Sequence, residues 1–202
     1  MNDVIETSKL YKMRISGGKA RGIRLRTGKA PGLRPATEAN RERLFSSIGE
    51  CVAGAKTLDL FAGTGSYGLE ALSRGASSAV FVEKNRKVSQ SLKENLVNVL
   101  KSAQLEEKVA QITVRDAMDF IKIEPATPYD IIFLDPPYSD ISILREQLFS
   151  KLLENRFVHS TSLLIHECPS GESETPKGWE LLRILGKTSK GSPIFHLFQK
   201  AV

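Results

Sequence analysis

The regular alternation of short apolar runs and helical patterns from Lys56 onward is the feature that most constrains the fold. Apolar runs typical of buried strands occupy residues 57–61, 79–83, 109–114, 129–134 and 162–167. Helical patterns cover residues 66–74, 85–101, 117–122 and 141–154. Because parallel strands need crossover helices, this order predicts a doubly wound α/β fold. Two closing strands, over 179–187 and 193–200, predict one antiparallel strand beside the last parallel one.

The segment before this alternation is strongly basic. Residues Lys9–Arg43 contain eleven lysines and arginines and only two acids, although the 202-residue chain carries a net charge of only +6. Its arginines alternate with glycine and proline rather than with helical acids. This pattern favours contact with a nucleic acid, and a basic face that merely meets solvent is the alternative.

The same segment suggests how the chain is organised. Residues 14–16 and 23–25 are predicted to be two short strands about a glycine turn. They follow a leader, residues 1–12, that precedes an alternative start at Met13. We expect an N-terminal leader and basic β-hairpin extension over residues 1–36 and an α/β domain over residues 37–202.

Several classes of protein are disfavoured by composition. No apolar run approaches the ~20 residues of a membrane span, and the N-terminus has no signal-peptide pattern. Cys51 and Cys168 lack CxxC spacing, and the three histidines lack the spacing of metal ligands. We therefore expect a cytoplasmic protein with neither a metal site nor a membrane partner.

A glycine-rich motif follows the first strand. Gly63, Gly65 and Gly68 form a GxGxxG pattern between a predicted strand and a predicted helix. Glu83 ends the second strand, where an acid can accept hydrogen bonds from ribose hydroxyls. This context predicts a nucleoside-binding site, whereas a tight turn with an incidental acid is the structural alternative.

Asp59 helps to separate two candidate cofactors, a nicotinamide dinucleotide and S-adenosylmethionine. It lies in the strand that leads into the glycine loop. A carboxylate there is unfavourable beside a pyrophosphate but suits a ligand that carries an ammonium and a sulfonium group. Asp116, after the third strand, is expected to bind the adenine amino group, to cap a helix, or to do both.

The string Asp135-Pro136-Pro137-Tyr138 ends the fourth strand as a stiff turn, because proline cannot donate to a sheet ladder. Methyl transfer to an exocyclic base nitrogen requires the amino group to be held in line with the methyl donor. The Asp135 carboxylate and the Pro136 carbonyl can accept its two hydrogens, and Tyr138 can stack on an extruded base. In a doubly wound sheet this strand end lies at the cofactor crevice. These residues are the predicted catalytic set.

The motif resembles the [DNS]PP[YFW] motif of amino-methyltransferases. Together with RISGGKARGIRL, GLRPATEANRERLF, LDLFAGTGSYGLEALSRGA and VFVEKN, it resembles the RsmD-type family. The resemblance implies a Rossmann-like class I methyltransferase fold with a seven-stranded, mostly parallel sheet. It also implies transfer from S-adenosylmethionine to N2 of a guanine in 16S rRNA, within the 30S subunit or its late precursor. Separately, we expect the enzyme to be a monomer. Ala36-Thr37-Glu38 and the final strand depart from the family pattern, and neither contains a residue of the predicted catalytic set.

The expected site residues follow from these motifs and from the resemblance. The cofactor-binding set is Asp59, Phe61, Ala62, Gly63, Gly65, Gly68, Glu83, Lys84, Asp116 and Ala117. The RNA-binding set is Arg14, Lys19, Arg21, Arg24, Arg26, Arg34 and Arg41. The motif does not separate guanine from adenine N6 in RNA or DNA. A dinucleotide-dependent oxidoreductase and a non-catalytic RNA-binding assembly factor are the alternatives from other classes.

Overall fold

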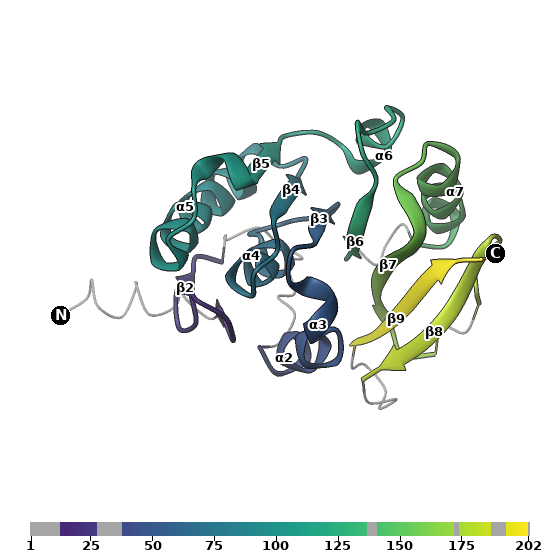
Figure 1. The fold of residues 1–202 in the computed structure, drawn as a ribbon. Helices are drawn as coiled ribbons and strands as arrows, with labels where there is room; N and C mark the ends of the chain where they lie inside the picture. Colours follow the sequence, from purple (N-terminus) through teal and green to yellow (C-terminus); the bar gives the residue numbers. More distant parts are fainter. Residues whose placement is uncertain (1–12, 28–37, 137–140, 172–173, 187–192, 202) are drawn as a thin grey trace.

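A seven-stranded sheet forms the centre of the protein (Figure 1). The computed structural model describes residues 13–27, 38–136, 141–171, 174–186 and 193–201, except for the side chains of 141–144. The strand order is β5-β4-β3-β6-β7-β9-β8. The strands are β3 (Lys56–Asp59), β4 (Ser78–Val82), β5 (Ala110–Thr113), β6 (Tyr129–Leu134), β7 (Val158–Pro169), β8 (Trp179–Leu185) and β9 (Pro193–Lys200).

The pairing of the strands confirms the predicted fold class. Strands β5, β4, β3, β6 and β7 run parallel, and β9 pairs antiparallel with both β7 and β8. The first half of the sheet winds outward from β3 to β5, and the chain then returns to place β6 on the other side of β3. This reversal makes the junction of β3 and β6 the place where a doubly wound fold opens a crevice.

Helices cover both faces of the sheet. They are α2 (Glu38–Ser47), α3 (Gly49–Val52), α4 (Ser66–Ser73), α5 (Arg86–Ala103), α6 (Ala117–Phe120) and α7 (Ile141–Glu154), with a 3-10 turn η1 (Glu107–Val109). Alternation along β6 divides the core: Ile132 and Leu134 pack with α6 and α7, whereas Ile131 and Phe133 pack with α2, α3 and α4. Both faces of the central strands are therefore buried, as parallel sheets require.

The N-terminal hairpin packs against the first half of the sheet. Strands β1 (Met13–Arg14) and β2 (Arg24–Leu25) pair antiparallel, and each is one residue shorter than predicted. Buried Ile15 and Leu25 share a hydrophobic cluster with α4 and α5. The expected boundary at residues 36 and 37 lies outside the described residues.

Asn95 connects this hairpin to the glycine loop. Its side chain is fully buried on α5. Its Oδ1 accepts from the Arg26 amide at 2.7 Å, and its Nδ2 donates to the carbonyls of Arg26 at 3.1 Å and Thr64 at 3.0 Å. Because one buried side-chain amide forms hydrogen bonds with the backbone of both segments, the end of the hairpin is fixed relative to the loop that follows β3.

Two features that are absent from the described residues bear on other functions. No helix within them is long and apolar enough to cross a membrane. They also contain no group of three or more His, Cys, Asp or Glu side chains placed to hold a metal ion.

Candidate active site

Four acidic residues meet where the parallel strands end, and we call this group the acid edge. Asp59 ends β3, Glu83 follows β4, Asp135 follows β6 and Glu167 lies near the end of β7. The register aligns Asp59 with Phe81 and Phe133, and Leu134 with His166, so Asp135 lies between Asp59 and Glu167 in the sheet. The Leu60 amide donates to the Phe133 carbonyl at 3.1 Å and continues the β3–β6 pairing into the loop.

The glycine loop turns tightly across the acid edge. Gly65 precedes α4 with a φ of 90°, a left-handed conformation that favours glycine. A Cβ on Gly68 would lie 2.3 Å from Cε1 of Phe81, so only glycine lets α4 approach β4 this closely. The predicted glycine motif therefore has a packing role that is independent of any ligand.

The buried carboxyl of Asp59 has a hydrogen-bond donor on only one of its two oxygens among the described residues. Its side chain is 2% exposed, and its Oδ2 accepts from the Gly68 amide at 3.1 Å. Its buried Oδ1 has no hydrogen-bond donor among the described residues. Burial, assisted by the charge of Glu83 and opposed by the Gly68 hydrogen bond, raises the pKa of Asp59 to about 7. A buried acceptor in this state fits a cationic ligand group, which would supply both a donor and a counter-charge.

Glu83 accepts hydrogen bonds from the glycine loop and from the segment that follows β4. Its Oε2 accepts from the Gly63 amide at 2.9 Å, and its Oε1 accepts from the Asn85 amide at 2.7 Å. The carboxylate is partly exposed, and each oxygen retains a second lone pair. It therefore shapes the glycine loop and can still accept hydroxyl hydrogens from a ligand.

The remaining predicted cofactor residues follow the carboxyl ends of β3, β4 and β5. Asp116 caps α6, where its Oδ1 accepts from the Met118 amide at 2.8 Å, so the capping role predicted for it is present. Ala62 and Ala117 are buried, Phe61 is partly buried and Lys84 is exposed. The Ala62 amide donates to the Val82 carbonyl at 3.0 Å and joins the loop to β4.

Asp135 follows β6 at the centre of the acid edge. Burial raises the pKa of its carboxyl well above the usual value, and the charges of Glu167 and Asp59 add to the effect. Pro136 is buried beside it. Tyr138, the third residue of the predicted catalytic set, lies outside the described residues.

Two residues at the acid edge were not predicted, Tyr67 and Glu167. The Tyr67 hydroxyl, on the first turn of α4, donates a buried hydrogen bond to Oε2 of Glu167. Sequence reasoning assigned Tyr67 only to the glycine loop and Glu167 only to the end of a strand. The sequence does contain a signal for Glu167. It is an acid at the carboxyl end of β7, the strand beside the one that leads into the Asp-Pro-Pro-Tyr motif.

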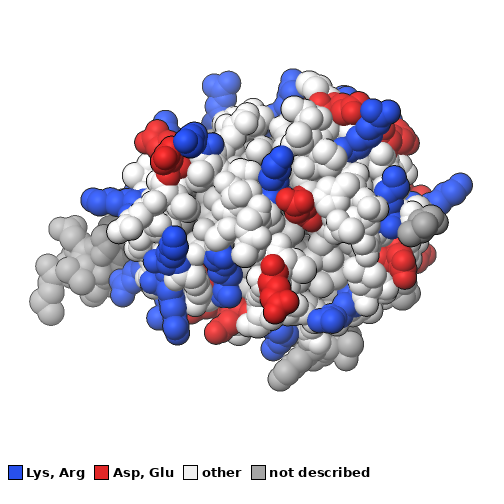
Figure 2. Space-filling view, viewed as in Figure 1, with Lys and Arg blue, Asp and Glu red and all other residues white. Residues whose placement is uncertain are grey.

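The hairpin displays five of the seven predicted RNA-binding residues at its surface. Arg14, Lys19, Arg21, Arg24 and Arg26 are all exposed. Figure 2 shows Lys and Arg side chains on the side of the molecule where the hairpin and α5 lie, with acidic side chains among them. Arg14 pairs with Glu38 and Arg26 pairs with Glu94. Arg34 lies outside the described residues.

The prediction for Arg41 is wrong, because its side chain is 0% exposed. Its Nε donates to Oε2 of Glu70 on α4 at 3.1 Å, and its Nη2 donates to the Arg14 carbonyl. A guanidinium held this way cannot contact RNA. The charge pattern of the sequence counted Arg41 with its exposed neighbours, although it is the counter-ion of a buried carboxylate.

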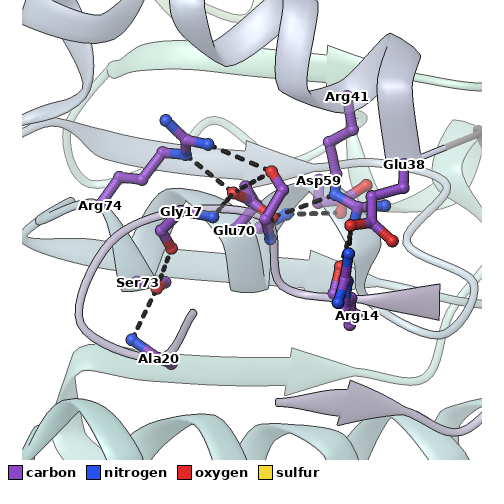
Figure 3. Close-up of polar contacts among 11 residues, drawn as sticks. Arg14, Gly17, Ala20, Glu38, Arg41, Asp59, Glu70, Ser73 and Arg74 are labelled. Carbon is purple, nitrogen blue, oxygen red and sulfur yellow. Dashed lines mark hydrogen bonds and ion pairs between the residues drawn. The ribbon is translucent and has the colours of Figure 1, made fainter. Parts of the chain in front are cut away.

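Glu70 lies at the centre of a buried network, which we call the Glu70 cluster (Figure 3), and of the Arg41 guanidinium only Nη1 has no hydrogen-bond partner among the described residues. Its carboxylate accepts from the amides of Ser16 and Gly17, both at 2.8 Å, and from Nε of Arg74 at 2.8 Å, besides Arg41. The Ser16 hydroxyl donates at 2.7 Å. These contacts join the hairpin, α2 and α4, so this buried ion pair connects the basic extension to the sheet.

The sheet order, the glycine loop and the acid edge together define a class I methyltransferase. Over residues 13–199 the chain matches the family described as Conserved hypothetical protein 95, and it belongs to that family.

Proteins with curated names and solved structures agree with this assignment. The chain is 36% identical over 191 residues to Ribosomal RNA small subunit methyltransferase D of Escherichia coli strain K12, across 94% of this chain and 90% of that protein. The protein of the same name from Haemophilus influenzae is 34% identical, across 93% and 94%. The solved structure of yhhF from Escherichia coli has a TM-score of 0.78 and 32% identity, across 94% and 98%. The predicted resemblance to the RsmD-type family is confirmed.

Proposed function

We propose that this enzyme transfers a methyl group from S-adenosylmethionine to the exocyclic N2 of a guanine in small-subunit (16S) rRNA. The observation that carries the proposal is the acid edge, where Asp59 and Asp135 lie at the ends of the paired strands β3 and β6 without a cationic partner among the described residues. The names of the methyltransferase D relatives support rRNA of the small subunit as the substrate. We further propose that the enzyme acts in the cytoplasm as a monomer, on the 30S subunit or its precursor.

The residues around the glycine loop fit this cofactor. The unpaired Oδ1 of Asp59 suits its ammonium group, Glu83 suits the ribose hydroxyls and Asp116 suits the adenine amino group. Phe61, Ala62, Lys84 and Ala117 complete the proposed pocket. When bound, S-adenosylmethionine supplies a methyl group activated by a positively charged sulfur.

The chemistry assigned to the protein is to hold the amine. The Asp135 carboxyl and the Pro136 carbonyl accept the two N–H hydrogens, which orients the nitrogen lone pair and favours the change toward a tetrahedral nitrogen. Tyr138 provides a ring on which the extruded base stacks. The exposed basic residues of the hairpin bind RNA phosphates beside it.

A test of the cofactor assignment is titration calorimetry. S-adenosylmethionine is expected to bind and NAD is not. Glu83→Ala is expected to weaken binding by roughly tenfold to a hundredfold, because hydrogen bonds to a charged acceptor contribute about 1.5–3 kcal/mol. Tight binding of NAD with no heat from S-adenosylmethionine would overturn the cofactor.

The test of the reaction is transfer of a tritiated methyl group to small ribosomal subunits from a strain that lacks the protein, followed by nucleoside mapping. The expected product is N2-methylguanosine. Label in N6-methyladenosine would favour the same chemistry on adenine. No label in rRNA, with naked RNA and precursor particles also tried, would leave only a binding role.

A further inference from the structure

Asp135 is flanked on both sides by acids that the first turn of α4 holds in place. The Gly68 amide donates to Asp59 on β3, and the neighbouring Tyr67 hydroxyl donates to Glu167 on β7. Strand β6, which leads into Asp135, lies between β3 and β7. The same helical turn therefore fixes both flanking carboxylates, and no described residue forms a hydrogen bond to the carboxyl between them.

The contact between Tyr67 and Glu167 is rigid because the tyrosine ring is packed on two sides. The ring stacks on Phe133 with centroids 5.4 Å apart and planes at 13°, and it meets Phe195 edge-on at 6.2 Å. Phe133 lies two residues before Asp135 on β6, and Phe195 is paired with Glu167 across β7 and β9. One aromatic contact thus comes from β6, which leads into Asp135, and the other from β9, the strand that pairs with β7 at Glu167.

The charges around the Asp135 carboxyl are unbalanced. Asp59 on β3 and Glu167 on β7 both face Asp135, and Glu83 acts on Asp59. Among the described residues the cation that acts on Tyr67 is Arg41 on α2, which is already paired with Glu70. From β9 the neighbour of Glu167 is the apolar Phe195. Like charges this close make protonation of the Asp135 carboxyl more favourable.

We propose that Glu167, held by Tyr67, is a positioning residue that makes Asp135 the acceptor of the proton which the amine loses. This inference rests on the proposed amino-methylation. As the nitrogen–carbon bond forms and the carbon–sulfur bond breaks, the positive charge passes from sulfur to nitrogen. An N–H bond then breaks, its electron pair stays on nitrogen, and the proton passes to Oδ of Asp135 and later to water. Glu167 forms no bond in this sequence and acts only through its charge on Asp135.

The burial and charge of this pair agree with such a role. Burial raises the pKa of Glu167, and the Tyr67 hydrogen bond opposes that rise. The pKa of Tyr67 is well above 10, so its hydroxyl remains a donor throughout the working pH range. The hydrogen bond therefore keeps Glu167 ionised to lower pH than burial alone would, and its charge then strengthens Asp135 as a base.

The principal variant is Glu167→Gln, which removes the charge and keeps an acceptor for Tyr67. Single-turnover methyl transfer is measured against pH, beside a ¹³C NMR titration of labelled aspartate and glutamate carboxyls in the ligand-free protein. We expect the Asp135 titration and the acid limb of the rate profile to move about one pH unit lower, as removal of a neighbouring like charge requires. Tyr67→Phe, which keeps the packed ring, is expected to move the Glu167 titration to higher pH.

Each outcome separates this inference from the proposed function. An unchanged Asp135 titration and acid limb in folded Glu167→Gln would overturn it and leave Glu167 with a packing role. If the wild-type protein methylates no rRNA, the proposed function fails, whereas the carboxyl titrations still report whether Glu167 controls Asp135. When Tyr67→Phe and Glu167→Gln are combined, Asp135 is expected to titrate as it does in Glu167→Gln alone. A larger shift in the double variant would contradict the inference that Tyr67 acts through Glu167.

Discussion

Helix α4 carries the buried carboxylate of Glu70, and its first turn contacts two carboxylates of the acid edge, Asp59 and Glu167; the surroundings of these carboxylates are opposite. Glu70 is fully buried and accepts hydrogen bonds from two arginines, a hydroxyl and two amides. At the acid edge Asp59 is equally hidden from solvent, yet one of its oxygens lacks a donor among the described residues. The same helix thus supports one carboxylate whose charge is balanced and others whose charge is not.

The buried charge of Glu70 stabilises the fold, whereas that of Asp59 is available to a ligand. Removing one partner of a buried ion pair leaves the other charge uncompensated, so the Glu70 cluster is expected to be costly to break. A carboxyl with a raised pKa destabilises the folded protein when it is ionised, and proteins retain such groups chiefly at functional sites. We infer that the first turn of α4 serves the reaction and that its next turn fixes the basic hairpin.

The largest expected effect is on stability, at the Glu70 cluster. Arg41→Met is expected to lower the free energy of unfolding by about 3–5 kcal/mol, because the buried Glu70 would keep only the partly exposed Arg74 as a counter-ion and the Arg14 carbonyl would lose its donor. Urea unfolding at neutral pH measures this change. Arg26→Met, at the exposed pair with Glu94, is the matched control and is expected to cost less than about 1 kcal/mol. Equal losses of unfolding free energy in Arg41→Met and Arg26→Met would show that the buried ion pair is no more important for stability than the exposed one.

The next largest expected effect is an increase in the free energy of unfolding, on substitution of Asp59. Because its folded-state pKa is raised from 3.8 to about 7, the folded protein binds more protons than the unfolded chain between these values, and stability falls as pH rises through that window. Asp59→Asn removes this penalty, so we expect unfolding at pH 8 to require up to about 4 kcal/mol more than in wild type. Near pH 4 the two proteins should converge.

Asp59→Asn is also expected to change the affinity for the cofactor. If Asp59 receives the ammonium group of the cofactor, Asp59→Asn is expected to be more stable and to bind S-adenosylmethionine at least tenfold more weakly, as loss of a charged hydrogen bond implies. Wild-type affinity should rise as pH increases through about 7, because the cation prefers ionised Asp59. Affinity in the variant that equals wild type across this range would contradict the role of Asp59.

The smallest effect concerns the hairpin that the Glu70 cluster holds. If about five exposed basic residues meet phosphates, log affinity for single-stranded RNA falls with log salt by a slope of roughly −3.5. Replacing Arg21, Arg24 and Arg26 with Ala is expected to flatten the slope by ~2. The control replaces Lys122, Lys151 and Arg156, which are exposed on the α6–α7 side. Equal slopes for both triple variants would assign RNA binding to another surface.

Much of the fold follows from the sequence because strand–helix alternation and short buried strands leave few topologies. The placement of Asp59, Glu83 and Asp135 at one edge was predictable for the same reason, since parallel strands end together. The order of the last three strands adds β9 between β7 and β8, which agrees with the expected antiparallel strand.

The details that the sequence did not reveal depend on contacts between distant segments. Tyr67 and Glu167 are 100 residues apart, and their hydrogen bond depends on the β6–β7 register and on the close packing of α4 at Gly68. Arg41 looked like its basic neighbours because local charge patterns do not show that Glu70, 29 residues later, is buried opposite it. Local pattern predicts elements and strand ends, whereas the partner of a buried charge requires tertiary structure.

We infer that the acid edge performs chemistry at the expense of stability, and a single variant, Asp135→Ala, tests both parts of this inference. Single-turnover methyl transfer and urea unfolding at pH 8 are measured on the same folded protein. We expect transfer to fall by ~10²–10³, with cofactor affinity little changed and the free energy of unfolding not lowered. Asp135→Asn should retain more activity, because its amide oxygen still accepts. Transfer by Asp135→Ala at the wild-type rate, or a loss of stability like that of Arg41→Met, would contradict the claim.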